Sequence, residues 1–166
     1  MRGQNEVRIV AEPGQATLQV IREFEAPREL VFRAHVDPEM YARWIGPSNE
    51  NVRMERWEAR DGGGYRWGGG SPETGEYWFV GAFHEVTAPE RIVTTFEFLG
   101  LGERGHVSLD VSTFEALPGG RTRITIRSAF TSVEDRDGII GSGMEHGVTE
   151  GYAKLDALLA ELVAAG

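Results

Sequence analysis

One block near the start of the chain, residues 22–44, constrains the fold more than any other stretch. A strand predicted over residues 16–24 precedes Pro27, which suits the first turn of a helix because its missing N–H would have no partner there. Asp37 followed by Pro38 predicts an N-cap and the start of a second helix. We expect the two short helices to form a V-shaped clip that bridges the ends of a curved sheet.

The composition bounds the class of protein. The chain has 166 residues, 40% of them apolar, so we expect a single domain over residues 16–166 after an N-terminal lead-in, residues 1–15. The net charge of −9 and the lack of a basic stripe argue against nucleic acid and an anionic membrane as partners. The absence of cysteine excludes a thiol nucleophile and a disulfide framework.

The hydropathy pattern predicts a soluble, cytoplasmic protein. The first six residues are polar and lack the apolar stretch of a signal peptide. No run approaches the ~18 apolar residues of a membrane-spanning helix.

Six or seven antiparallel strands are predicted, most of them in a meander. They cover residues 16–24, 52–59, 65–67, 76–86, 92–98, 106–116 and 121–130. Glycine-rich turns are predicted at residues 60–64 and 68–75. Met54 runs out of phase with Trp57, which indicates a β-bulge in that strand.

The C-terminal region is predicted to hold a short helix capped near Ser132 and a long helix from about Ser142. Apolar residues recur at a 3–4 spacing along the long helix, at Met144, Val148, Tyr152, Leu155, Leu159 and Leu162. Gly143, Gly147 and Gly151 form a glycine stripe, although a glycine inside a helix costs about 1 kcal/mol relative to alanine. Two explanations stay open: close packing of the helix on the sheet, or a hollow beneath the helix.

This order of elements resembles the START-like helix-grip superfamily and, within it, the proteins similar to the activator of heat-shock protein 90 ATPase. The resemblance covers about residues 16–164. It is carried by the opening block, by Glu-Ala-Arg-Asp-Gly-Gly at 58–63, and by residues 81–93, 120–123 and 143–159. It implies an α+β helix-grip fold, in which a curved six- to seven-stranded antiparallel sheet wraps around a long C-terminal helix and two short helices follow the first strand.

The resemblance also implies an apolar cavity between the sheet and the C-terminal helix, used across the superfamily for lipids, polyketides and other hydrophobic ligands. Aromatic residues concentrate in the clip and the middle strands, and pockets favour apolar walls with a few polar groups. The predicted ligand-binding residues are Tyr41, Trp44, Trp57, Tyr65, Trp67, Trp78, His84, Met144, Gly147, Val148, Gly151 and Tyr152.

Acid–base catalysis has three candidates, His84, His146 and Tyr65. His84 alternates with Trp78 along one strand and could donate to a polar ligand group if their face lines the cavity. His146 lies beside the glycine stripe, where its side chain could reach the entrance of the groove between the sheet and the long helix.

The other two histidines are interpreted as structural or surface residues. His35 follows Val31 by one helical turn and is expected to be partly buried and satisfied. His106 shares a phase with Ser108 and Asp110, which indicates the solvent-facing side of a strand.

No motif predicts a metal or a cofactor. The pair His84-Glu85 lacks the second histidine of an H-E-x-x-H helix, since Ala88 holds that place. The glycine runs lack the Gly-Lys-Ser/Thr of a phosphate loop, and there is no G-x-S-x-G nucleophile elbow.

Three hypotheses for function follow. The first is a protein that binds a small hydrophobic or aromatic molecule between the sheet and the C-terminal helix. The second is a cyclase- or aromatase-like enzyme whose pocket histidine or tyrosine relays protons. The third is an interaction module of the chaperone-activator kind. The sequence also leaves open whether the chain forms a homodimer.

Overall fold

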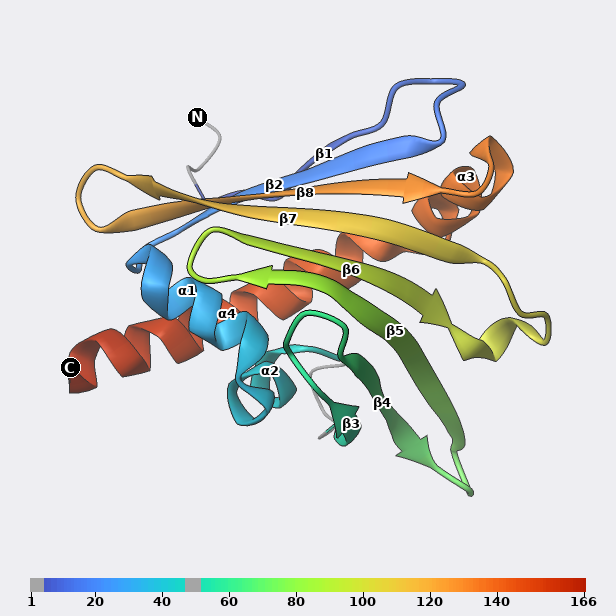
Figure 1. The fold of residues 1–166 in the computed structure, drawn as a ribbon, viewed down its shortest axis with the longest axis horizontal. Helices are drawn as coiled ribbons and strands as arrows, with labels where there is room; N and C mark the ends of the chain where they lie inside the picture. Colours follow the sequence, from blue (N-terminus) through green and yellow to red (C-terminus); the bar gives the residue numbers. More distant parts are fainter. Residues whose placement is uncertain (1–4, 47–51) are drawn as a thin grey trace.

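The computed structural model describes residues 5–46 and 52–166 and confirms the predicted α+β architecture (Figure 1). The strands are β1 (Arg8–Val10), β2 (Thr17–Phe24), β3 (Arg53–Trp57), β4 (Gly64–Ser71), β5 (Gly75–Thr87), β6 (Arg91–Phe98), β7 (Val107–Leu117) and β8 (Arg121–Phe130). The helices are α1 (Arg28–Val36), α2 (Pro38–Trp44), α3 (Val133–Gly141) and α4 (Met144–Ala165), with a 3-10 turn η1 (Leu99–Leu101) after β6.

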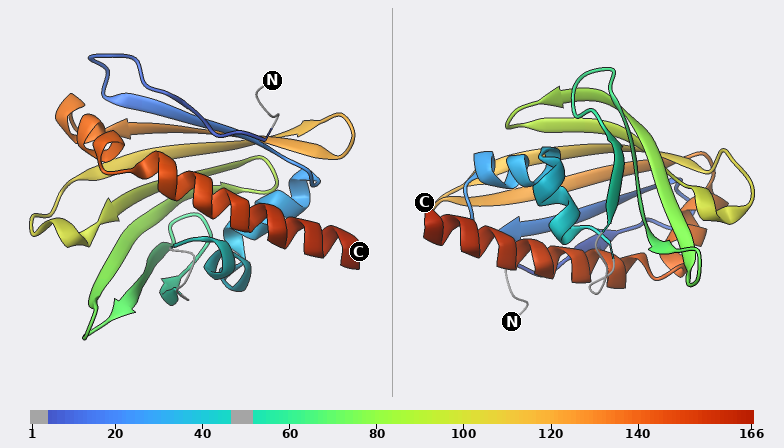
Figure 2. Two further views of the ribbon diagram at one scale, coloured as in Figure 1. Left: turned by 180° about the vertical axis from the view of Figure 1, so that it is seen from behind. Right: turned by 90° about the horizontal axis from the view of Figure 1, so that it is seen from below.

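The described residues form one antiparallel sheet of eight strands in the order β1-β2-β8-β7-β6-β5-β4-β3. Strands β3 to β8 are the predicted meander, and β2 joins it by pairing with β8. The strand count exceeds the predicted six or seven because residues 8–10, within the predicted lead-in, pair with β2 as an edge strand. The sheet curves around α4, and α1 and α2 lie against the C-terminal half of that helix (Figure 2).

The helical clip forms as its sequence predicts. The Asp37 carboxylate accepts hydrogen bonds from the backbone N–H groups of Glu39 and Met40, at 2.9 and 3.2 Å, and thereby caps α2. Such a cap contributes about 1 kcal/mol. The Trp44 indole N–H donates to the carbonyl of Ala34 at 2.9 Å, which ties α2 back to α1.

We divide α4 at Gly151, where it packs on α2, and call the segments before and after this residue its N-terminal and C-terminal halves. The C-terminal half forms the core together with the clip and β2. Its buried side chains are Tyr152, Leu155, Leu158 and Leu159. Full burial of one such leucine contributes roughly 1.5–3 kcal/mol. Arg22 on β2 donates two hydrogen bonds to the Asp156 carboxylate, at 2.8 and 2.5 Å, and fixes this half of the helix to the sheet.

Strand β4 is longer than predicted. The glycine turn predicted at residues 68–75 is wrong in its first half, since β4 continues through Gly68 and Gly69. A Cβ on Gly68 would lie 2.5 Å from the Trp78 ring, and one on Gly69 would lie 2.3 Å from the Tyr77 hydroxyl. These glycines therefore make room for two aromatic side chains of β5 that cross the strand.

Two other local signals are confirmed. Ser132 caps α3 by accepting a hydrogen bond from the backbone N–H of Asp135 at 3.0 Å. The register of β3 against β4 shifts between Met54 and Arg56, which is the predicted bulge.

The three glycines of the predicted stripe have three different environments. Gly143 precedes α4 with a φ of +87°, a left-handed conformation, so the helix begins at Met144, two residues later than predicted. Gly147 is exposed and faces open space. A Cβ on Gly151 would lie 3.4 Å from the carbonyl oxygen of Trp44, so α4 packs closely on α2 at this point.

Candidate functional site

The register of the sheet decides which side chains face the helices. Successive side chains of a strand point to opposite faces, so Asp110 and Phe114 share one face of β7. Phe114 packs on Phe32 of α1, with ring centroids 5.0 Å apart, which identifies this as the concave face. The same face of the middle strands carries Tyr65, Trp67, Phe79, Phe96, Ile126 and Ser128.

Three rings form a continuous surface on the concave face, which we call the aromatic floor: Trp67, Phe79 and Phe96. Trp67 stacks on Phe79 with ring centroids 4.5 Å apart, and Phe79 stacks on Phe96 at 5.0 Å. Trp67 is 3% exposed, whereas Phe79 and Phe96 are only half-buried. The floor therefore presents apolar surface that its own side chains do not cover.

On the middle strands of this face, two buried polar atoms have no hydrogen-bond partner among the described residues: Trp67 Nε1 on β4 and Asp110 Oδ1 on β7. Arg22 Nε on β2 is a third such atom on this face. Burial raises the pKa of the Asp110 carboxyl, while the hydroxyls of Ser128 and Ser108 act in the opposite direction. The interpretation of Ser108 and Asp110 as solvent-facing is wrong. Ser108 and Asp110 share the strand face of Phe114, so their side chains point toward the helices.

Tyr41 on α2 lies over the floor. Its ring stacks on Trp57 at 4.7 Å and meets the Trp67 ring edge-on at 6.1 Å. Burial raises its pKa, the charge of Asp110 adds to that effect, and the nearby Trp67 indole lowers the pKa, although Nε1 lacks hydrogen-bond geometry. The pKa of Tyr41 is therefore influenced by both Trp67 and Asp110, which places the three side chains near one another.

Tyr65 has its hydroxyl engaged in the sheet. The hydroxyl donates to the carbonyl of Thr95 at 2.6 Å, and burial raises its pKa. A Cβ on Gly81 would lie 2.4 Å from the Tyr65 hydroxyl, so this glycine lets the side chain cross β5. The Tyr65 hydroxyl therefore has a structural role, since its proton is donated to a backbone carbonyl.

Other predicted aromatic residues are held in the core by their polar groups. The Trp57 indole N–H donates to the carbonyl of Val36 at 2.7 Å, and the Trp44 indole is bonded to Ala34 as described above. The Tyr152 ring packs on Phe24 with centroids 5.1 Å apart. These contacts connect the clip, β3 and α4.

The first turns of α4 place few side chains against the sheet. Met144 and Val148 are half-buried, and Gly147 between them carries no side chain. The His146 side chain is 87% exposed and lies 3.4 Å from the Glu150 carboxylate. The predicted ligand residues Met144 and Val148 thus lie on the inner side of α4, whereas His146 points to solvent.

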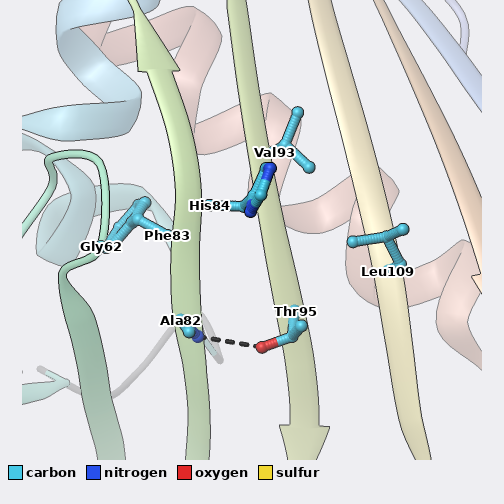
Figure 3. A pocket seen from close by; sticks show the side chains of 7 residues that line it. All are labelled: Gly62, Ala82, Phe83, His84, Val93, Thr95 and Leu109. Carbon is cyan, nitrogen blue, oxygen red and sulfur yellow. Dashed lines mark hydrogen bonds between the residues drawn. The ribbon is translucent and has the colours of Figure 1, made fainter.

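Trp78 and His84 lie on the convex face, opposite to the helices, with the alternation expected along β5. The Arg66 guanidinium lies 4.3 Å from the Trp78 ring centroid. His84 is exposed beside a hollow of about 460 Å³ between β5, β6 and β7, lined also by Val93 and Leu109 (Figure 3). The sheet therefore separates these two residues from the aromatic floor.

A second hollow, of about 330 Å³, lies between α1 and the β5–β6 turn and includes Phe32 and Pro89. Neither hollow lies between the sheet and the N-terminal half of α4.

His35 is enclosed between Trp44 and Phe114, with ring centroids 4.8 and 5.1 Å away. Its Nδ1 lies 2.7 Å from the carbonyl oxygen of Val31, whereas its buried Nε2 has no partner among the described residues. Burial lowers the pKa of His35 to about 4. This histidine is a neutral residue of the core.

His106 is a surface residue as predicted, although not through its phase with Ser108 and Asp110, because it precedes β7, which begins at Val107. It lies 3.0 Å from Asp135 and 3.5 Å from Glu103, and hydrogen bonding to Asp135 is the main cause that raises its pKa. It connects the loop before β7 to α3.

Sequence reasoning missed Asp110 and gave no role to Phe96. A usable signal was the phase of Phe114: it lies four residues after Asp110, so both must share a face of β7. Asp110 is also paired with Ser128, which is in phase with the buried Ile124 on β8.

A curved antiparallel sheet that grips a long helix, with a helix pair after the first long strand, defines a START-like helix-grip domain. The family model described as "Activator of Hsp90 ATPase homolog 1-like protein" matches residues 25–160, and the chain belongs to this family. The resemblance found in the sequence is confirmed. A comparison with curated proteins gave no match.

Solved bacterial structures share the fold. A crystal structure of a protein from Rhodobacter sphaeroides is 25% identical, with a TM-score of 0.83, and the match covers 95% of this chain and 99% of that chain. A solution structure of a protein from Arthrobacter aurescens is also 25% identical, with a TM-score of 0.81 and coverages of 93% and 91%. An AHSA1 protein from Silicibacter pomeroyi is 23% identical, with a TM-score of 0.69 and coverages of 87% and 98%.

Two features are absent from the described residues. None of their helices has both the length and the apolar character needed to cross a membrane. No three His, Asp or Glu side chains in this part of the chain are grouped so that they could hold a metal ion.

Proposed function

We propose that this protein binds a small apolar or aromatic molecule on the concave face of the sheet, beneath the N-terminal half of α4. The observation that carries the proposal is the aromatic floor, which stays half-buried at Phe79 and Phe96 under a helix segment with few inward side chains. Aromatic rings bury large areas, and ligand sites use such apolar walls with a few polar groups. The helix-grip fold supports ligand binding in general.

Binding can be tested with the neutral dye N-phenyl-1-naphthylamine, which fluoresces in apolar surroundings. We expect saturable fluorescence with the unaltered protein. Val148→Trp adds a large ring on the inner side of α4 and is expected to weaken dye binding at least tenfold. Met144→Trp is a second blocking variant, in case Val148→Trp does not fold.

The matched control is Leu109→Trp, which adds the same ring on the convex face, where Leu109 is 44% exposed. We expect its dye affinity to stay within twofold of the unaltered protein. If both blocking variants fold, as judged by thermal melting, and bind dye as tightly as the control, the proposed site is wrong.

The cyclase-like alternative rests on His84, His146 and Tyr65 as the acid–base residues. His84 and His146 lie outside the concave face, and the Tyr65 hydroxyl is bonded to Thr95. No specific observation on the site therefore favours this second function. A chaperone-activating role stays a prediction from the family resemblance.

A further inference from the structure

Resting on the proposed function, we infer the polarity of the ligand. We propose that it is an aromatic ring compound with two oxygen substituents, one accepting a hydrogen bond from Trp67 Nε1 and the other, a hydroxyl, bonding to Asp110 Oδ1. Trp67 and Asp110 would thus recognise the two oxygen substituents of the ligand.

Trp67 supplies the first half of the argument. Its side chain is 3% exposed, stacked on Phe79 and unpaired at Nε1. Two other tryptophans differ from Trp67 in this respect, because the Trp44 and Trp57 indoles each donate to a backbone carbonyl. A buried indole N–H is a donor only and usually finds a partner. Trp67 lies near enough to the Tyr41 hydroxyl to lower the Tyr41 pKa, but Nε1 has no partner with hydrogen-bond geometry among the described residues, so a ligand oxygen can serve as its acceptor.

Asp110 supplies the second half. Its Oδ1 is buried and unpaired, and no ion pair joins Asp110 to a basic side chain in the part of the chain that the structure describes. Its cross-strand neighbours are Thr94 on β6 and Ser128 on β8, both neutral. The hydroxyls of Ser128 and Ser108 interact with the carboxyl but leave Oδ1 without a partner, and a buried polar atom in that state is costly unless a ligand completes its hydrogen bonds.

The two atoms together select among ligand groups. An ammonium group only donates, so it would pair with Asp110 and leave the Trp67 N–H without an acceptor. An unsubstituted hydrocarbon would satisfy neither atom. A hydroxyl both donates and accepts, so it suits the carboxyl in either protonation state, and a second oxygen suits the indole. Phe79 on β5 and Phe96 on β6 lie on the two strands between Trp67 on β4 and Asp110 on β7, so a ligand ring stacked on them would lie between the two polar atoms.

The test is a series of three probes: naphthalene, 2-naphthol and 2,6-dihydroxynaphthalene. Affinities are measured by displacement of N-phenyl-1-naphthylamine from the unaltered protein. We expect the dihydroxy compound to bind at least tenfold more tightly than naphthalene, since each new hydrogen bond to a buried, unpaired group adds affinity.

Two variants remove one polar group each, Trp67→Phe and Asp110→Leu. In each folded variant we expect the ratio of the dihydroxy compound's affinity to that of naphthalene to fall by about half on a logarithmic scale, measured against naphthalene binding to the same variant. Trp78→Phe, the convex-face control, should leave the whole series unaltered. Because the two polar groups are changed separately, one variant still decides if the other does not fold.

The outcomes separate the two proposals. If naphthalene binds and is blocked by Val148→Trp, but the hydroxyls add no affinity, the inference about polarity is overturned and the proposed function stands. If the hydroxyls add affinity that neither Trp67→Phe nor Asp110→Leu reduces, the assignment of residues is overturned. If no probe displaces the dye from the concave face, both proposals fail.

Discussion

The two halves of α4 lie over one sheet but in different surroundings. The C-terminal half buries Leu155 and Leu159, packs on the clip and is fixed to β2 through Arg22 and Asp156. The N-terminal half carries the exposed Gly147, and its inner side chains Met144 and Val148 are only half-buried. The same helix therefore anchors the fold at one end and leaves aromatic surface uncovered at the other.

The difference teaches how a small domain keeps a site inside a stable fold. Stability comes from large apolar burial, which the C-terminal half supplies. Ligand binding requires apolar surface that the protein does not fill itself. Because the two tasks fall to different halves of one helix, residues of the N-terminal half can change without loss of the core. The experiments below at Leu155 and Val148 and at Gly147 test this division.

The largest expected effect comes from truncating one side chain in each half. Leu155→Ala leaves a cavity in the core and is expected to lower the free energy of unfolding by about 3 kcal/mol. Val148→Ala removes a half-buried side chain and should cost about 1 kcal/mol or less. Urea denaturation measures both, and equal losses would contradict the division of the helix.

Acidification should weaken the clip side of the molecule. The folded-state pKa of His35 is lowered to about 4, whereas the unfolded chain takes up the proton near pH 6.5. The stability linked to His35 is therefore fully present above pH 6.5 and is lost as the pH falls toward 4. The loss amounts to about 3 kcal/mol.

Urea denaturation at a series of pH values measures this effect, with His35→Phe as the comparison. The phenylalanine keeps a ring beside Trp44 and Phe114 but cannot titrate. We expect the variant to lose less stability than the unaltered protein between pH 6.5 and 4. The same pH dependence in both proteins would show that His35 is not the group responsible.

A smaller effect is expected from Gly147→Ala. The added methyl group meets no atom within 4 Å, and alanine is favoured over glycine inside a helix by up to about 1 kcal/mol. The variant should melt at a slightly higher temperature and keep its dye affinity. A marked loss of binding would place Gly147 in contact with the ligand and would sharpen the boundary of the site.

The smallest effect concerns His106, which connects α3 to the loop before β7. Its pKa is raised mainly by the hydrogen bond to Asp135. The stabilisation is therefore present below the unfolded pKa near 6.5 and is lost as the pH rises through the folded value. We expect His106→Gln to remove this dependence, which NMR titration of the histidine and amide exchange in α3 can follow.

The fold was largely predictable because its signals are local. Asp37 with Pro38, and Ser132 before Asp135, mark helix starts through caps that need only neighbouring backbone groups. The edge strand at residues 8–10 was not predicted as a separate element, since it depends on pairing with β2. The extension of β4 was missed because its glycines indicate a turn unless the overlying rings of β5 are known.

The candidate site was less predictable because it depends on which face of each strand is covered. Trp67 was correctly singled out as an aromatic residue, but nothing local distinguishes its unpaired indole from the bonded indole of Trp57. Asp110 was assigned to solvent since a carboxylate on a strand is usually exposed. His84 was placed on the right strand phase, yet phase alone does not tell the concave face from the convex one.

The most direct test of the central claim is a ¹H–¹⁵N NMR titration that follows the indole N–H signals. The chain has four tryptophans, and Trp67 and Trp78 lie on opposite faces of the sheet. Assignment comes from Trp67→Phe and Trp78→Phe. On addition of 2,6-dihydroxynaphthalene, we expect the Trp67 indole signal to shift most, downfield, and the Trp78 signal to stay in place. A shift of Trp78 alone, or of neither signal at saturating ligand, would contradict a ligand site on the aromatic floor.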